Sequence, residues 1–174
     1  VKSGYENKPV VGVTWNSAVR FINWLHYNTA KIESGEPFSS FIPQTEGDSV
    51  RGAYNTKDLS DLNKAVISCR TRNSGARYWL PNREEWIKAC FFDGNEWNED
   101  WIAKGTNYYD PDKGWGYPYP HIKDVGLGVE KSFWGTYDQQ GNVAEWLENV
   151  MEPTWRLVCG GSLIRPVSYT SILS

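Results

Sequence analysis

Thiols are the first side chains to consider for chemistry, because the sequence holds three cysteines, Cys69, Cys90 and Cys159. They are widely separated and form neither a CxxC pair nor any other zinc-ligand spacing. The three thiols allow one disulfide, but buried and unpaired thiols are the favoured interpretation. The sequence therefore predicts no zinc site.

Carboxylates and imidazoles are the next candidates. The segment 110–114 carries two aspartates and a glycine, as a calcium loop would, but it lacks the EF-hand ligand order and a closing glutamate. A surface turn is the favoured interpretation. The two histidines are far apart, and we expect His26 to end a helix and His121 to lie in a loop.

Composition excludes several classes of protein. A chain of 174 residues with 40% hydrophobic and 22% charged residues is typical of one soluble globular domain. No apolar run approaches the roughly 20 residues that span a bilayer, so we predict no membrane span. The net charge is −3 and the basic residues are scattered, so nucleic acid is not an expected partner.

The aromatic content is unusual, with ten Trp and ten Tyr against six Phe. Indoles and phenols have apolar bodies and polar tips, so they suit a fold whose loops pack over aromatic rings. We therefore expect little regular secondary structure.

Two helices are predicted to position the rest of the chain. The first follows a strand at Val10–Val13, carries apolar residues at helical spacing from Trp15 to Leu25, and is capped by Thr14 or Asn16. The second begins at Asn82, because Glu85 three residues later completes a capping box.

The remaining segments are predicted to be mostly loop. Residues 32–73 are rich in Ser, Gly, Asn and Asp, with strand nuclei only at 52–54 and 65–67. Gly and Pro recur through 93–129 and interrupt both the helical and the strand spacing of apolar residues, so long ordered loops are expected there. The segments on either side of 141–146 are predicted to be strands or turns.

Four sequence blocks stand out along the chain, and they are Pro9–Trp15 with Trp24-Leu25, Tyr78–Asn82 with Glu85-Trp86, Gly141–Trp146, and Gly160–Ser162. In this order they resemble the signature blocks of the sulfatase-modifying-factor (formylglycine-generating-enzyme-like) family. The resemblance implies an α+β fold, a variant of the C-type lectin fold, with two main helices, small antiparallel sheets and long loops. It covers residues 1–174 as a single domain that we expect to be incomplete at both ends, a fragment without the family's opening strand and its closing Gly-Phe-Arg type motif.

The resemblance also implies where copper chemistry would lie. Oxygen-dependent members bind Cu(I) through cysteines at the third and eighth positions after the Gly-Gly-Ser serine, and soft thiolates select Cu(I). Those positions are Arg165 and Thr170 here, so no copper is expected. Ser162 and Tyr169 match retained family residues and are interpreted as structural or ligand-binding residues rather than catalytic ones.

The active-site groove of the family's enzymes uses a tryptophan between the Val and the Glu of the third block. This chain has Ala144 there, followed by Trp146, so we expect a larger and less aromatic pocket. An iron-dependent branch needs a His-rich helix motif, and two distant histidines cannot assemble an iron triad.

A calcium site is the one metal site that the resemblance carries over. The carboxylates of Asp138 and Glu145 and the carbonyls of Gly141 and Val143 would form the hard oxygen set that Ca²⁺ prefers. The alternative needs no metal: Asp138 then ends a strand and Glu145 binds loop amides. Both alternatives stay open.

Two functions compete at this point. In the first, the chain is a binding or scaffold module for a protein or peptide ligand, as in related variable proteins of phages and bacteria that use this fold for binding. The Glu-Pro-Asn and Trp-Asn-Asp motifs of sugar-binding lectins are absent. In the second, it is a formylglycine-generating-type oxidoreductase or one domain of a larger enzyme. The resemblance favours an exported or cell-surface location.

Overall fold

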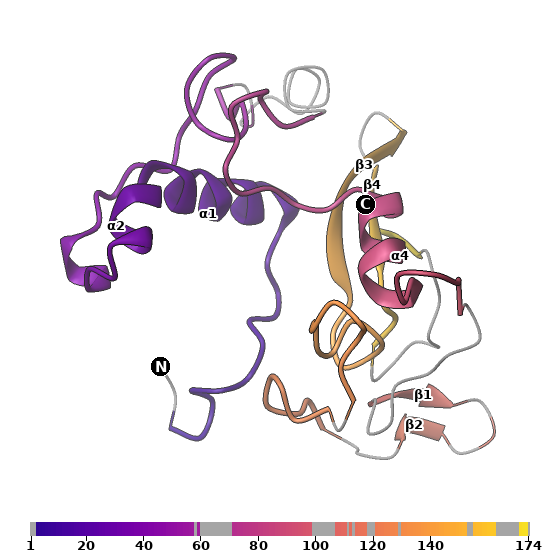
Figure 1. Ribbon diagram of the computed structural model, residues 1–174. Coiled ribbons are helices and arrows are strands. Elements are labelled where there is room, and N and C mark those ends of the chain that lie inside the picture. The colour runs from indigo at the N-terminus through magenta and orange to yellow at the C-terminus, as the bar shows by residue number, and fades with distance from the viewer. Residues whose placement is uncertain are drawn as a thin grey trace. The chain divides into compact units, whose positions relative to one another are not determined.

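The computed structural model describes residues 3–57, 59, 71–98, 107–110, 112, 114–117, 121–128, 130–152, 155–162 and 171–173. The contacts within the chain divide it into two compact units. The first unit comprises Val1–Gly12, Asn82–Leu147 and Leu157–Leu173, and the second comprises Val13–Pro81, Glu148–Arg156 and Ser174. Each unit is described by itself, and Figure 1 labels their elements.

The second unit is built on helix α1 (Trp15–Tyr27). Thr14 caps it, because its side-chain oxygen accepts a hydrogen bond from the Ser17 backbone N–H. Trp15, Val19 and Asn23 recur every four residues and form its buried stripe. This predicted helix is confirmed, and His26 lies in its last turn as expected. A short helix α2 (Thr29–Glu33) and a 3₁₀ turn η1 (Phe38–Ser40) follow.

The first unit is built on helix α4 (Arg83–Phe91), which the predicted capping box starts. The Asn82 side chain accepts from the Glu85 N–H, and the Glu85 carboxylate accepts from the Asn82 N–H. The helix buries its inner face in a core shared with the strands β3 (Glu145–Glu152) and β4 (Trp155–Cys159). That core consists of Trp86, Cys90, Phe91, Leu147, Leu157 and Cys159.

Two small sheets complete the described elements. In one, β3 and β4 lie side by side and β5 (Ser171–Leu173) pairs with β4 (Figure 1). The other is an antiparallel hairpin of β1 (Tyr108–Asp110) and β2 (Gly114–Tyr117), with a register irregularity between its two residue pairs. The prediction of long ordered loops over 93–129 was therefore wrong for this hairpin. Its two strands contain no proline, because Pro111 falls between them in the sequence. Asp112, between the strands, is exposed in a turn, as predicted.

Two predicted strands did not form. Val10 and Val11 are 81% and 56% exposed, and Gly12 has a φ of +70°, which breaks an extended run. Valine-rich sequence favours a strand only where a partner strand supplies hydrogen bonds and cover. Residues 52–54 are bends rather than a strand, and the predicted nucleus at 65–67 lies outside the described residues.

Within the described residues, no helix is long and apolar enough to cross a membrane. This agrees with the absence of a long apolar run in the sequence.

Candidate functional site

The Gly141–Trp146 block of the first unit begins with a left-handed backbone. Gly141 has a φ of +85° and Asn142 a φ of +60°, and both residues are buried. Glycine and asparagine tolerate this region better than other residues, which explains their use here. The Gly141 N–H donates to the Gly160 carbonyl over 2.5 Å. The turn therefore holds the third sequence block against the fourth.

Gly160 makes this close approach possible. Its φ is +93°, and a Cβ atom there would lie 2.5 Å from the Gln139 carbonyl oxygen. A side chain cannot fit at that distance without a backbone shift. Residues 139–142 and 160 thus form one tightly packed turn cluster, which the sequence indicated only as two separate motifs.

Two buried asparagines tie this cluster to a neighbouring loop. The Asn142 side chain accepts from the Lys123 N–H at 2.9 Å and donates to the Lys123 carbonyl at 3.3 Å. The Asn142 N–H donates to the Asn107 carbonyl, and the Asn107 amide donates to the His121 carbonyl. The Asn107 Oδ1 atom is buried and has no hydrogen-bond partner in the part of the chain that the structure describes. A buried oxygen of this kind favours a further donor or a cation beside it.

The block ends in a carboxylate that is held by an indole. Glu145 Oε2 accepts a hydrogen bond from Trp86 Nε1 at 2.5 Å. Burial raises the pKa of Glu145 to about 7, with the Asp138 carboxylate adding to the increase and the Trp86 hydrogen bond opposing it. Asp138 has a φ of +60°, and its Oδ2 atom accepts from the Gly126 N–H at 2.5 Å. The two carboxylates are therefore close enough to repel each other.

These residues fit a calcium ion in their chemistry. Asp138 and Glu145 each engage one carboxylate oxygen in the hydrogen bonds above and keep a second oxygen. Among the described residues, no group of three His, Cys, Asp or Glu side chains could hold a metal, so backbone carbonyls such as those of Gly141 and Val143 would have to complete the set. The metal-free alternative was wrong in its details. Asp138 ends no strand, and the side-chain partner of Glu145 is an indole rather than loop amides.

The thiols of this unit are not available for chemistry. Cys90 and Cys159 are buried and form no disulfide, and burial raises the pKa of each thiol to about 12. A buried, protonated thiol is neither a nucleophile nor a metal ligand. The interpretation of buried thiols is confirmed for these two residues, and Cys69 lies outside the described residues.

The predicted ligand-binding residues are only partly described. Ala144 and Trp146 flank Glu145 and are half-buried, and Ser162 is half-buried in an isolated strand bridge after the Gly-Gly pair. The turn cluster brings these two stretches into one unit. Arg165, Tyr169 and Thr170 lie outside the described residues.

Comparison with protein families shows to which family the chain belongs. The family described as the sulfatase-modifying factor enzyme 1-like domain matches residues 1–173. This chain belongs to the sulfatase-modifying-factor family. A search of curated proteins finds no match.

Two solved structures share the fold of this sulfatase-modifying-factor domain. The chain of the crystal structure of CarF is 24% identical with a TM-score of 0.57, over 96% of this chain and 62% of that one. Variable protein 1 of Treponema denticola is 20% identical with a TM-score of 0.54, over 97% of this chain and 66% of that one. This chain thus spans less than two thirds of either relative. Together with few helices and small sheets, the likeness confirms the α+β, C-type-lectin-like fold.

Sequence reasoning missed a polar cluster in the second unit of the family domain. The buried Glu148 carboxylate accepts from the Tyr54 hydroxyl at 3.1 Å and forms an ion pair with the Arg72 guanidinium at 2.9 Å. The Tyr54 hydroxyl also accepts from the Leu80 N–H, and the Arg72 guanidinium lies 4.7 Å from the centre of the Trp79 ring. Burial raises the pKa of Tyr54, so its hydroxyl stays protonated. No local motif marks these residues, because they come from distant parts of the sequence.

Proposed function

We propose that this sulfatase-modifying-factor domain is a noncatalytic binding or scaffold module for a protein or peptide ligand. The observation that carries the proposal is the identity of the two residues at the family's copper positions, Arg165 and Thr170, neither of which supplies a thiolate. The described cysteines cannot substitute for them, since Cys90 and Cys159 are buried with raised pKa values.

The proposed ligand surface is defined by positions within and after the third and fourth sequence blocks, and three of its residues, Ala144, Trp146 and Ser162, are described. It consists of Ala144, Trp146, Ser162, Arg165, Tyr169 and Thr170. The replacement of an indole by the small Ala144 enlarges the space available to a ligand, while the half-buried Trp146 supplies an aromatic face. The hydrogen-bonded turns beneath provide a rigid support for such a surface, which keeps recognition separate from folding.

A copper experiment separates this proposal from a formylglycine-generating-type oxidoreductase. The protein is incubated with a sulfatase-motif peptide, oxygen and Cu(I), and the peptide is analysed by mass spectrometry. We expect no aldehyde and no Cu(I) uptake. The double variant Arg165→Cys with Thr170→Cys is the matched control, and we expect it to take up Cu(I). Aldehyde formation by the unaltered protein would contradict the noncatalytic proposal.

We also propose a structural Ca²⁺ site formed by Asp138, Gly141, Val143 and Glu145. The effect of the Asp138 charge on Glu145 supports it, because a cation beside the two carboxylates would offset their repulsion. Chelator-stripped protein is titrated with Ca²⁺ by calorimetry, and its melting temperature is recorded with and without the ion. We expect heat of binding and a higher melting temperature, both lost in Asp138→Asn. No heat and an unchanged melting temperature would overturn the proposal.

A further inference from the structure

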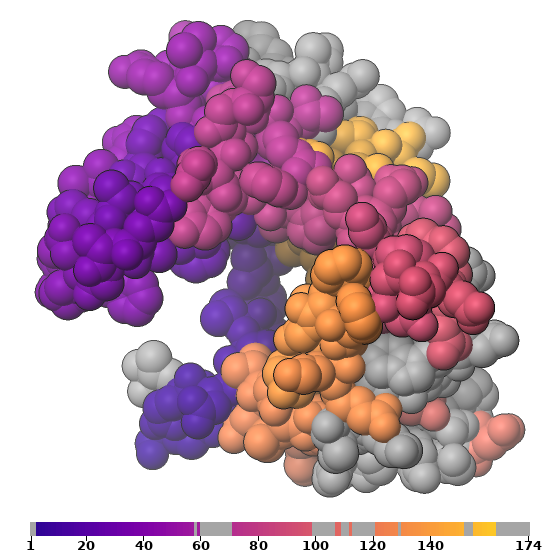
Figure 2. Space-filling view, viewed as in Figure 1, coloured from indigo at the N-terminus to yellow at the C-terminus, as the bar shows by residue number. Residues whose placement is uncertain are grey.

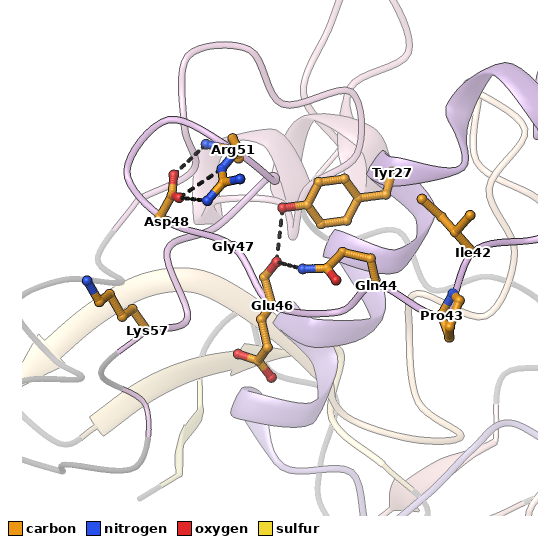
Figure 3. A pocket seen from close by; sticks show the side chains of 9 residues that line it. All are labelled: Tyr27, Ile42, Pro43, Gln44, Glu46, Gly47, Asp48, Arg51 and Lys57. Carbon is orange, nitrogen blue, oxygen red and sulfur yellow. Dashed lines mark hydrogen bonds and ion pairs between the residues drawn. The ribbon is translucent and has the colours of Figure 1, made fainter.

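The second unit contains a hollow of about 860 Å³ beside the C-terminal half of α1 (Figure 3). In the sequence, its lining residues are far from every residue of the proposed ligand surface. Its volume lies within the range of about 300–1,000 Å³ that is usual for ligand sites. Its lining comprises Tyr27, Ile42, Pro43, Gln44, Glu46, Gly47, Asp48, Arg51 and Lys57. Apart from Tyr27, all of these residues come from one loop, 42–57.

That loop is fixed by amide side chains of α1 and its C-cap. The Asn28 side chain donates to the Ile42 carbonyl and accepts from the Ile42 N–H. The fully buried Asn23 side chain donates to the carbonyls of Thr45 and Tyr54 and accepts from the Tyr54 N–H. Figure 3 shows the Tyr27 hydroxyl and the Gln44 amide both directed at the Glu46 carbonyl, to which each donates. The hollow is therefore preformed, which lowers the entropy cost of binding.

Among the described residues, the charges around the hollow leave the Lys57 ammonium group without a carboxylate partner. Glu46 pairs with Arg20 at 2.6 Å. Asp48 pairs with Arg51 at 2.9 Å, and this pair fixes the direction of the guanidinium (Figure 3). Lys57 is exposed, and in the described part of the chain its ammonium group forms no ion pair. The side chains thus favour a ligand with a negative group near Lys57 and Arg51.

An aromatic cluster of the same unit includes Phe41, which precedes the lining residue Ile42 in the sequence. Its members are the rings of Phe21, Trp24, Phe38 and Phe41. The Trp24 ring centre lies 5.1 Å from that of Phe41 and 5.8 Å from that of Phe21. Phe21 and Phe38 are 55% and 75% exposed, and Ile42 is 45% exposed. The segment that carries these residues is indigo to purple in Figure 2, where it forms part of the molecular surface. An exposed apolar patch of this kind is typical of a binding surface.

We infer that the aromatic cluster and the hollow together bind an extended acidic peptide segment that carries a large apolar residue and, several positions along, a carboxylate, because Ile42 and Lys57 lie at opposite ends of the lining (Figure 3). The apolar side chain would pack on Phe21 and Phe38, and the carboxylate would meet Lys57 and the free donors of Arg51. Charge complementarity selects this occupant over a neutral or basic segment. The site is independent of the proposed ligand surface, because it lies in the other unit and shares no residue with it.

A fluorescence-anisotropy titration tests the inference. The probe is a fluorescein-labelled hexapeptide of leucines flanked by glutamates, capped at both ends, and its comparison is the same peptide with glutamines. We expect the glutamate peptide to bind, and Lys57→Glu to weaken it about tenfold. Phe38→Ala should weaken it several-fold. Both residues are exposed, so circular dichroism should show an unchanged fold.

The controls separate this site from the other. Lys131→Glu reverses another exposed lysine, in the first unit, and we expect no change in affinity. Trp146→Ala alters the proposed ligand surface and should also leave this affinity unchanged. Equal binding of the two peptides, or of Lys57→Glu and the unaltered protein, would overturn the inference. So would the absence of binding at about 1 mM protein.

Discussion

The turn cluster of the first unit and the polar cluster of the second are stabilised by different kinds of interaction. At Gly141 and Gly160, backbone groups contact each other directly, and the glycines are needed because no side chain fits. Around Glu148, by contrast, buried side chains fill the space and satisfy one another, with Tyr54 and Arg72 as partners. The first arrangement needs particular residues in a fixed local order. The second needs only that three distant side chains meet.

This difference explains why the turn cluster could be predicted from the sequence and the polar cluster could not. A turn with a left-handed glycine constrains its neighbours in the chain, so it produces a motif. A buried ion pair constrains residues that are far apart, as Arg72 and Glu148 are, and leaves no local pattern. The stability of the domain should nevertheless depend on both, and substitutions in each cluster test this.

The largest effect is expected for Glu148→Ala. The change removes the acceptor for the Tyr54 hydroxyl and a counter-charge of the Arg72 guanidinium, whose side chain is only 21% exposed. Breaking one side of a buried pair costs about 3–5 kcal/mol. Urea unfolding at neutral pH should show a loss of this size.

A matched control exists in the same unit. Glu33 pairs with Arg77 at a similar distance of 2.8 Å, but their side chains are 58% and 63% exposed. Glu33→Ala should cost less than about 1 kcal/mol, because water screens an exposed pair. Equal losses in the two variants would mean that the Glu148 cluster contributes no more than a surface ion pair.

A smaller loss is expected from adding one methyl group to a glycine in each unit. Gly160→Ala would place a Cβ atom against the Gln139 carbonyl in a left-handed backbone, and Gly47→Ala would place one against the carbonyls of Tyr54 and Arg51. Each steric conflict should cost about 1–3 kcal/mol, with about 1 kcal/mol more at Gly160 for its positive φ. Thermal unfolding of both variants measures the difference.

Gly35→Ala isolates the backbone contribution. Gly35 has a φ of +72°, but nothing lies within 4 Å of the position that a methyl group would occupy, so only backbone strain of about 1 kcal/mol is expected. If Gly47→Ala were no more destabilising than this control, the loop 42–57 would be softer than its hydrogen bonds indicate.

The sequence predicted the parts of the fold that local physics determines. The Thr14 cap, the capping box at Asn82 and the apolar spacing of α1 all act within a few residues, and each was confirmed. The strand expected at Val10–Val13 failed because strand formation depends on a distant partner. The hairpin of β1 and β2 was missed for the complementary reason, since strand pairing formed between two short segments on either side of Pro111.

The candidate site was predictable to the same degree. The motif residues Asp138, Gly141 and Glu145 stay predicted calcium ligands, and the Asp138 charge raises the pKa of Glu145 together with burial. The role of Trp86 as the partner of Glu145 and the buried oxygen of Asn107 depend on packing between segments, so no sequence pattern indicated them. The hollow beside α1 could not be predicted from the sequence either, because the asparagines that fix its loop form no recognisable sequence motif.

The smallest effect on stability is expected from two turns, one in each unit, in which an aspartate side chain accepts hydrogen bonds from backbone N–H groups two and three residues later. In the second unit, Asp48 Oδ1 accepts from the N–H groups of Val50 and Arg51, and its Oδ2 also accepts from the Arg51 guanidinium. In the first unit, Asp93 Oδ1 accepts from the N–H groups of Asn95 and Glu96. The backbone hydrogen bonds from Arg51 and Val50, followed by the guanidinium, lower the pKa of Asp48 from 3.8 to about 2, and the two N–H groups lower the pKa of Asp93.

A lowered pKa means that the carboxylate stabilises the folded state at pH values above its unfolded pKa, and that this contribution is lost as the pH falls. For Asp48 the loss should occur between about pH 3.8 and pH 2. Asp48→Asn keeps the turn acceptor but removes the charge, so its unfolding free energy should approach that of the unaltered protein over this range. Urea titrations at several pH values, with Asp93→Asn as the matched variant, measure this.

Because Asp48 has the guanidinium and Asp93 has only backbone donors, about 1 M salt should weaken the Asp48 contribution more. An equal salt response in the two variants would show that backbone hydrogen bonds alone determine both turns.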